Sequence, residues 1–272
     1  MKQPVTIPGA LNLRRLSPTP GGAPVLALHS LGLDGDSFAG MAQALAPTFE
    51  VWAFDQRGHG AQRNRPATGF DDLVADAELV IDHLSASQPV HLIGHSMGGA
   101  VAATAAARRG GRARSVMTIA TPARGMPAFL DRATAQKSGL EVCIGTTMSR
   151  WFEQPDREVP AVQIARAALA RMTPAGFDAS WHALAEFPGF AEIAASLPAL
   201  CALAYCDDRS TPPAVLDDIA DSVATSGGHA QRVDITDAGH MGLLEKPGPT
   251  AEAFAMFVAN LPVATASKDD AS

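Results

Sequence analysis

The chain has 272 residues and a mass of 28.2 kDa, with 47% hydrophobic and 18% charged residues. This length favours one α/β domain with an elaboration, and the composition supports a large buried core while excluding a disordered or coiled-coil protein. The net charge of −7 comes from 28 acidic and 21 basic residues scattered in short clusters. No basic stripe is available to bind a phosphate backbone or an anionic membrane, so we expect neither nucleic acid nor a membrane as a partner.

The sequence gives no indication of export or of a metal site. The longest stretch without Asp, Glu, Lys or Arg, residues 84–107, is broken by a proline and two histidines, so it cannot cross a bilayer as a continuous apolar helix. No apolar signal segment precedes Arg14. Cys143, Cys201 and Cys206 have neither zinc nor redox spacing and fit small buried hydrophobic residues. We therefore expect a soluble cytoplasmic protein without metal or cofactor.

Short apolar runs and helical patterns alternate in the first half of the chain. The runs that predict buried strands are residues 24–28, 50–54, 89–93 and 115–119. Between them, helical periodicity covers residues 38–45, 71–84 and 97–108. Strands buried on both faces and separated by helices indicate a mostly parallel sheet flanked by helices. Residues 5–16 also predict a pair of strands around Pro8 and Gly9.

The strand signal disappears between residues 122 and 197, where helical patterns and prolines replace it. It resumes with predicted strands at 199–205 and 231–236, followed by a closing helix at 249–260. A further helix is predicted at 214–224, between those two strands. We therefore predict a core domain of residues 1–121 and 198–262, interrupted by a helical cap at 122–197. The small polar segment 263–272 is predicted to be disordered.

A G-x-S-x-G motif, residues 94–98, follows the strand predicted at 89–93 and opens an alanine-rich helix. The bare pattern is expected by chance in about one such sequence in ten. A strand, a sharp turn and a helix in this order are nevertheless what a nucleophile elbow needs to expose a serine hydroxyl. A dinucleotide-binding turn requires a different glycine spacing. Ser96 is therefore the candidate nucleophile.

A serine hydroxyl needs a general base to take its proton and a carboxylate to orient that base. In folds that carry such an elbow, the acid follows a late strand and the histidine follows the last one. His240 follows the last predicted strand and is the candidate base. Asp207 and Asp208 both follow the strand at 199–205. We prefer Asp208 for its offset from Thr211 and Pro212, with Asp207 as the alternative.

An oxyanion hole requires two backbone N–H donors, one from the residue after the nucleophile and one from a loop after an earlier strand. Met97 supplies the first and Leu31 is the candidate for the second. His29 is expected to brace the loop that contains Leu31. The run from Asp55 to His59 lacks a metal-ligand set, so we expect it also to brace a loop.

These positions together resemble the α/β-hydrolase superfamily over nearly the whole chain. A closer resemblance, to 3-oxoadipate enol-lactonases and their relatives, is carried by residues 28–34, 150–152, 172–177, 238–241 and 244–247. The resemblance implies the α/β-hydrolase fold with a helical cap above a triad of Ser96, Asp208 and His240. It also implies hydrolysis of an enol-lactone, a cyclic ester, through an acyl-enzyme.

Two positions depart from the pattern of that family. Ala185 stands where an arginine is expected, and Leu130 is the nearest match to a tryptophan that is usual early in the cap. Loss of an arginine that holds a substrate carboxylate predicts a less acidic ester or lactone. Arg124, Arg132 and Arg150 are the residues that could compensate for it.

Six aromatic residues of the predicted cap suggest an apolar pocket: Phe129, Trp151, Phe152, Trp181, Phe187 and Phe190. Each alone is explained more simply by packing of the cap on the sheet. As a set they favour a small hydrophobic acyl or lactone substrate, with Trp151, Phe152 and Trp181 as candidate contacts.

The sequence therefore predicts a cofactor-free serine hydrolase that cleaves a small-molecule ester or lactone, and it leaves open whether the chain forms a homo-oligomer. A C–C bond hydrolase or a perhydrolase with the same three residues is one alternative. The other is a ligand-binding protein that keeps the fold without turnover.

Overall fold

The structure is a computed structural model that describes residues 11–262. Its centre is a seven-stranded sheet in the order β1-β3-β2-β4-β5-β6-β7. The strands are β1 (Arg14–Arg15), β2 (Ala23–Leu28), β3 (Phe49–Ala53), β4 (Val90–His95), β5 (Ala113–Ile119), β6 (Ala199–Tyr205) and β7 (Ala230–Ile235). Neighbouring strands are parallel except β1 and β3, which are antiparallel. The predicted mostly parallel sheet is therefore confirmed.

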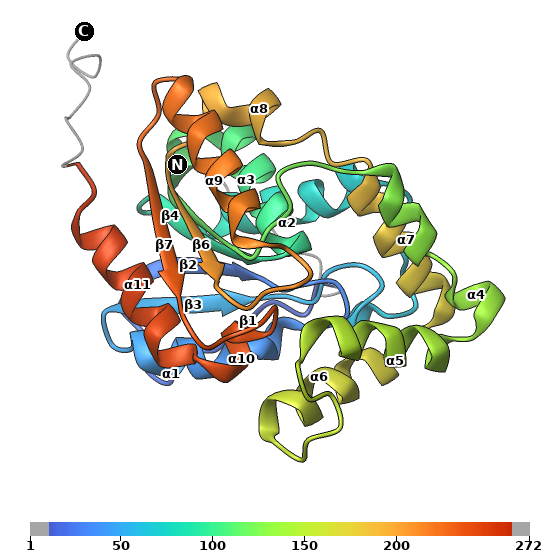
Figure 1. The fold of residues 1–272 in the computed structure, drawn as a ribbon. Coiled ribbons are helices and arrows are strands. Elements are labelled where there is room, and N and C mark those ends of the chain that lie inside the picture. The colour runs from blue at the N-terminus through green and yellow to red at the C-terminus, as the bar shows by residue number, and fades with distance from the viewer. Residues whose placement is uncertain (1–10, 263–272) are drawn as a thin grey trace, which may run out of the picture.

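Helices cover both faces of the sheet (Figure 1). On one face lie α1 (Ala39–Leu45) and α11 (Pro247–Ala259); on the other lie α2 (Phe70–Leu84), α3 (Met97–Arg109) and α9 (Pro213–Thr225). The apolar run of β2 contributes side chains to the hydrophobic core on both faces of the sheet. Val25 and Ala27 pack in the core under α1 and α11. Leu26 and Leu28 pack in the core under α2 and α3. Alternation of side chains along a strand buried on both faces accounts for the continuous apolar pattern.

A helical segment connects β5 to β6 and spans residues 127–196. Its elements are η5 (Pro127–Arg132), α4 (Ala135–Ser138), α5 (Leu140–Trp151), α6 (Pro160–Ala170), α7 (Pro174–Ala185), α8 (Phe190–Ile193) and η6 (Ala194–Ser196). Helices α4 to α7 lie together to one side of the sheet in Figure 1, and α8 lies beside α9 and α3. The remaining short helices are η2 (Gly35–Phe38), η3 (Gly60–Gln62), η4 (Gly110–Arg112) and α10 (Gly242–Glu245).

The first half of the strand pair predicted at 5–16 and the tail at 263–272 lie outside the described residues, and β1 pairs with β3. The expectation that all three cysteines are buried is wrong for Cys206, which is exposed. Cys206 is the first residue after β6 and lies in the loop beyond the strand, whose side chains are buried on both faces.

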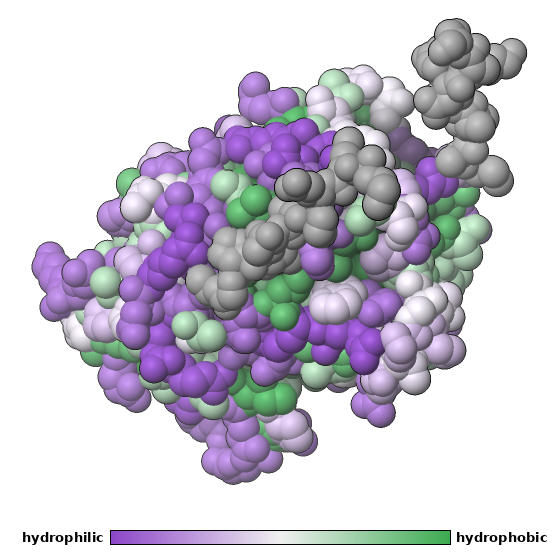
Figure 2. Space-filling view, turned by 180° about the vertical axis from the view of Figure 1, so that it is seen from behind, coloured by the Kyte–Doolittle hydropathy of each residue, from purple (hydrophilic) through white to green (hydrophobic). Residues whose placement is uncertain are grey.

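The surface shows no broad apolar area on the face drawn in Figure 2, outside the parts that grey atoms cover. Hydrophobic residues on that face are scattered among hydrophilic ones. Within residues 11–262, no helix combines the length and the hydropathy needed to cross a bilayer.

Candidate active site

Ser96 lies in the sharp turn between β4 and α3. Its φ of 53° and ψ of −118° place it in a region that non-glycine residues rarely adopt. The Ser96 N–H donates to the carbonyl oxygen of Ile119 at 2.8 Å, and the Ser96 carbonyl accepts from the Gly99 N–H at 2.9 Å. These bonds hold the strained backbone in place at the wall of a pocket. The geometry matches that of a nucleophile elbow.

The glycines of the motif allow β4, α3 and β2 to approach closely. A Cβ atom at Gly98 would overlap the carbonyl oxygen of Leu28 in β2, and one at Gly94 would overlap the backbone of Gly98. A Cβ at Gly99 would overlap the side chain of Thr121. The turn therefore requires glycine on both sides of Ser96 for steric reasons.

Gly98→Ala is expected to destabilise the protein by about 3 kcal/mol or more, because backbone rather than a flexible side chain meets the new methyl group. Urea denaturation of the variant measures this loss. Gly111→Ala is the matched control, since no atom lies within 4 Å of its added Cβ. Equal stability of the two variants would contradict the close approach of the Leu28 backbone to Gly98.

His240 and Asp208 form a buried pair. The Nδ1 atom of His240, which follows β7, lies 2.8 Å from Oδ2 of Asp208, which follows β6. Because an ionised carboxylate only accepts hydrogen bonds, Nδ1 carries the proton and Nε2 is left as the basic nitrogen. Oδ1 of Asp208 accepts the N–H groups of Ser210 at 2.7 Å and Thr211 at 3.0 Å.

Burial alone would raise the pKa of Asp208. The charge and hydrogen bond of His240 and the N–H groups of Thr211 and Ser210 outweigh that effect, so the pKa lies below its usual value. Asp207 differs from its neighbour, because its side chain is exposed and its own N–H donates to the carbonyl of Ala238 at 3.1 Å. Of the two candidate acids, only Asp208 contacts His240.

His95 supports the backbone of His240. Its Nε2 lies 2.8 Å from the carbonyl oxygen of His240, and the two ring centroids are 5.2 Å apart. Nε2 must donate, because the carbonyl can only accept. Burial, followed by the nearby charge of His240, lowers the pKa of His95 to about 3, so its ring is neutral. No local sequence pattern indicates this contact, since 145 residues separate the two partners.

Two neutral histidines hold the loop that contains Leu31. The N–H of Gln56 donates to Nε2 of His29 at 2.9 Å, and the N–H of Gly32 donates to Nε2 of His59 at 3.0 Å. The two rings meet edge to face, with centroids 4.9 Å apart. Burial lowers the pKa of both rings, to about 3 in His59. These contacts are the bracing expected of His29 and of residues 55–59.

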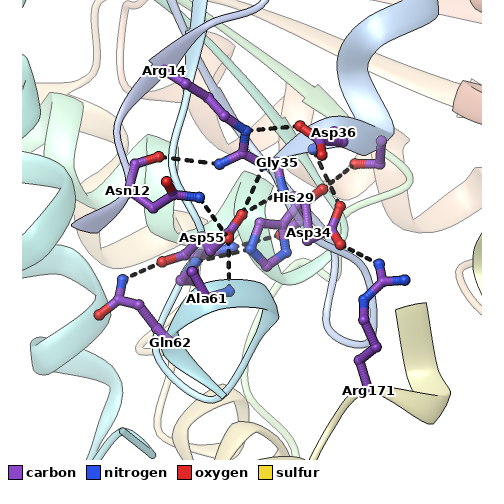
Figure 3. A network of polar contacts seen from close by, with 12 residues as sticks. Asn12, Arg14, His29, Asp34, Gly35, Asp36, Asp55, Ala61, Gln62 and Arg171 are labelled. Atoms are coloured by element: carbon purple, nitrogen blue, oxygen red, sulfur yellow. Dashed lines mark hydrogen bonds and ion pairs between the residues drawn. The ribbon is translucent and has the colours of Figure 1, made fainter. Parts of the chain in front are cut away.

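Asp55 lies at the centre of a second set of contacts to the same loop, shown in Figure 3. Its carboxylate accepts from the N–H groups of Gly35 at 3.1 Å and Ala61 at 2.9 Å, and it pairs with Arg14 at 2.9 Å. Burial would raise the pKa of Asp55, but the N–H groups, His29 and Arg14 lower it to about 2.

Arg171 connects the helical segment to this loop. It follows α6, and its Nη2 lies 2.5 Å from Oδ2 of Asp34 in the loop after β2 (Figure 3).

Leu31 and Met97 are the residues whose backbone N–H groups were predicted to form the oxyanion hole. Met97 is the first residue of α3, and Leu31 lines the pocket beside Ser96. Within the described part of the chain, neither N–H donates to another protein group. Both donors are therefore free for a ligand oxygen, in a loop and a helix start that the contacts above hold rigidly.

Stability should fall as the pH falls from about 6.5 to 4. Burial lowers the pKa of His59 and His95 to about 3 and of His91 to about 4, so the unfolded chain binds more protons than the folded chain in this range. Each histidine contributes up to about 1.4 kcal/mol of lost stability per pH unit. Urea denaturation between pH 4.5 and 7 measures the slope.

His91→Gln serves as the control, because it removes one of these three groups and should reduce the slope by about one proton. Most carboxylates protonate at lower pH, so they contribute little in this window. A flat profile, or one that rises toward pH 4.5, would contradict the assignment of these histidines as neutral in the folded chain.

The pocket has a volume of about 280 Å³, at the small end for ligand sites. It brings Ser96, Leu31 and His240 together with Trp151 of α5 and Trp181 of α7. The ring of Trp151 lies 6.3 Å from that of His240. Helices α5 and α7 therefore supply one wall of the cavity above the carboxyl ends of the strands.

Phe129 also lines this pocket, whereas the cap aromatics Phe152, Phe187 and Phe190 do not. Phe152 lines a different pocket, behind Asp208. Phe187 packs against Phe70 and Phe190, with ring centroids 5.3 and 5.6 Å away. Among the residues that line the pocket of Ser96, neither Ala185 nor Leu130 is present. The two departures from the enol-lactonase pattern therefore do not reshape this wall directly.

Comparison with known proteins agrees with this fold. The family model described as "alpha/beta hydrolase fold" matches residues 23–141, the segment from β2 past the elbow to the start of α5. The chain has the α/β-hydrolase fold. The enol-lactonase from Burkholderia xenovorans LB400 superposes on this α/β-hydrolase with a TM-score of 0.81, covering 92% of this chain and 99% of the other at 23% identity. That likeness establishes the fold, as the sequence resemblance predicted.

Two curated relatives extend the comparison. A pimeloyl-(acyl-carrier protein) methyl ester esterase from Chromobacterium violaceum is 34% identical over 155 residues, which are 56% of this chain and 58% of that protein. The match thus spans little more than half the length of that relative. An (E)-2-((N-methylformamido)methylene)succinate hydrolase from Acinetobacter baylyi is 22% identical over 250 residues, 89% of this chain and 92% of the other. This α/β-hydrolase is therefore similar to hydrolases of differing specificity.

Proposed function

We propose that this α/β-hydrolase cleaves a carboxylic ester or lactone through an acyl-enzyme, with Ser96 as nucleophile, His240 as base and Asp208 as the orienting acid. The observation that carries the proposal is one pocket. It is lined by Ser96, in its strained turn, and by His240, whose Nδ1 is held at 2.8 Å by Asp208. Nucleophile, base and orienting acid are the three roles that acyl transfer by serine requires.

The reaction proceeds in two halves. The Oγ atom of Ser96 attacks the substrate carbonyl carbon while Nε2 of His240 takes the hydroxyl proton. The tetrahedral intermediate then expels the alcohol oxygen, which receives that proton, and the acyl group remains on Ser96. In the second half His240 deprotonates a water that attacks the acyl carbon, and Ser96 leaves with the proton. In a lactone the alcohol oxygen stays attached to the acyl chain.

The negative charge of each intermediate falls on the former carbonyl oxygen. The N–H groups of Leu31 and Met97 are proposed to donate to it, since they are free of other acceptors and belong to rigid elements. Asp208 stabilises the imidazolium form of His240 that arises in each half-reaction. The scheme uses these side chains, the substrate and water alone. The small pocket favours a short acyl chain or a single ring.

Stopped-flow hydrolysis of short-chain nitrophenyl esters tests the proposal. The wild type is expected to release a burst of about one nitrophenolate per protein molecule, because an acyl-enzyme accumulates when its hydrolysis is the slower half. Mass spectrometry of acid-quenched protein should then find the acyl group on the peptide that contains Ser96. Release no faster than with Ser96→Ala, or an acyl group on another residue, would overturn the proposal.

A further inference from the structure

Two arginines from the helical segment line the same pocket as Ser96. Arg132 ends η5 and Arg150 lies near the end of α5, and both side chains are partly buried. Both guanidinium groups lie against Trp181, with Cζ atoms 4.9 Å and 5.5 Å from the ring centroid. The Cζ atom of Arg132 is also 5.4 Å from the ring of Phe129. Segments that are separate in sequence thus place two positive charges on one aromatic wall.

Neither arginine has a carboxylate partner among residues 11–262. In the described chain, the one hydrogen bond of the Arg150 guanidinium runs from Nη2 to Oγ1 of Thr147 at 3.2 Å, and its Nε is buried without an acceptor. Burial lowers the pKa of Arg132. Burial, and then the charge of Arg132, lowers that of Arg150 to about 10. Two like charges therefore share a poorly hydrated wall without compensation.

Two other partly buried arginines of the chain do have carboxylate partners. Arg57 pairs with Asp72 at 2.7 Å and Asp76 at 2.8 Å. Arg14 pairs with Asp36 at 2.7 Å and Asp55 at 2.9 Å. Because unpaired buried charge is costly, arginines are normally matched in this way. Arg132 and Arg150, on the wall of the candidate active site, are not matched in this way.

The polar atoms of this wall are donors. The indole Nε1 of Trp181 is buried without an acceptor, like Nε of Arg150. A third arginine, Arg124, is exposed and also lines the pocket. The one acidic side chain in that lining is Asp218 of α9, which is exposed. A ligand group that fits this wall must be an acceptor and should carry negative charge.

We propose that Arg132, Arg150 and the indole N–H of Trp181 bind a free carboxylate on the acyl part of the substrate, so that the preferred substrate is a monoanionic half-ester or carboxylated lactone. This inference rests on the proposed function of Ser96. The acyl part stays in the pocket through both half-reactions while the alcohol leaves, so a contact to its far end orients both steps. The substrate class is the opposite of the less acidic one that Ala185 predicted.

The site should discriminate by charge. A carboxylate placed at the two guanidinium groups supplies the missing acceptors and removes their mutual repulsion. A neutral ester of the same shape leaves both charges unpaired, and a cationic ester adds repulsion. The discrimination therefore comes from the wall formed by residues 127–196, whereas the chemistry comes from the sheet domain.

Kinetics with matched methyl esters test the proposal. Monomethyl adipate carries the free carboxylate, and methyl 6-methylheptanoate replaces that carboxylate with an isopropyl group of the same shape. With hydrolysis followed by pH-stat, the wild type is expected to show a KM about tenfold to hundredfold lower for the anionic ester. Arg132→Gln and Arg150→Gln should remove most of that preference, and Arg150→Lys should restore part of it.

Arg166→Gln is the matched control, because Arg166 of α6 pairs with Asp156 at 3.5 Å and does not line this pocket. It is expected to keep the preference for the anionic ester. Thermal unfolding of every variant checks that the fold is intact. If Arg132→Gln and Arg150→Gln raise KM equally for both esters, the arginines only pack the wall and the subsite is overturned.

Calorimetric titration with adipate separates this inference from the proposed function. Adipate is expected to bind the wild type and Arg166→Gln but not Arg150→Gln. Hydrolysis of both esters with equal KM in the wild type, together with no adipate binding, overturns the subsite and leaves the proposed function standing. Adipate binding that depends on Arg150, without hydrolysis of any ester, supports the subsite and overturns the proposed function.

Discussion

Ser96→Ala is expected to lower kcat for ester hydrolysis by about a millionfold, the order of loss when a serine nucleophile is removed from a working triad. The variant should stay folded, since the Ser96 hydroxyl contacts the pocket and the backbone bonds that hold the turn do not involve it. Its free energy of unfolding should change by less than about 1 kcal/mol. Steady-state kinetics and urea denaturation of the same preparation measure both quantities.

Ser210→Ala is the matched control for this experiment. Ser210 lines the same pocket, and its hydroxyl lies 3.4 Å from the carbonyl oxygen of Arg150. Its N–H, which donates to Asp208, is kept by alanine. Activity of Ser210→Ala within about tenfold of the wild type is expected, because only a long hydrogen bond is lost. Retained activity in Ser96→Ala would mean that another group attacks the substrate.

Asp208→Asn is expected to lower kcat by about ten-thousandfold with little change in KM. An amide in place of the carboxylate can donate to Nδ1 of His240, which favours the tautomer whose proton sits on Nε2, and that tautomer cannot act as a base. The variant also loses the negative charge that stabilises the imidazolium. Kinetics with a short-chain nitrophenyl ester above pH 7 measure the effect.

Asp207→Asn makes the same chemical change one residue away. Because the Asp207 side chain is exposed and has no contact with His240, kcat should stay within about twofold of the wild type. The two variants therefore decide between the two acids that the sequence left open. An equal loss in both, or a larger loss in Asp207→Asn, would contradict the assignment of Asp208.

The mostly parallel sheet and the place of the elbow could be predicted from the sequence because local patterns encode them. The run Val25 to Leu28 is apolar at every position, as a strand buried on both faces requires. His240 and Asp208 could be located because each follows a strand whose carboxyl end meets the same edge of the sheet. The preference for Asp208 over Asp207 could not be settled from the sequence, since adjacent residues differ only in the direction that the loop gives their side chains.

Contacts between distant segments were beyond prediction. His95 binds a carbonyl 145 residues away, and Gly32 binds the ring of His59. The convergence of Arg132 and Arg150 on Trp181 depends on how η5, α5 and α7 pack, and no periodic pattern reports that packing. Trp151 lines the pocket of Ser96 but its neighbour Phe152 does not, because α5 ends between them.

Labelling with a fluorophosphonate tests the central claim most directly, since this reagent reacts with serines that a neighbouring base has activated. The wild type is expected to gain one phosphonyl group, mapped by mass spectrometry to the peptide that contains Ser96. Labelling should be absent in Ser96→Ala and slowed in Asp208→Asn, with Asp207→Asn labelled as the wild type is. Folded wild-type protein that stays unlabelled, or that is labelled on another residue, would contradict the account.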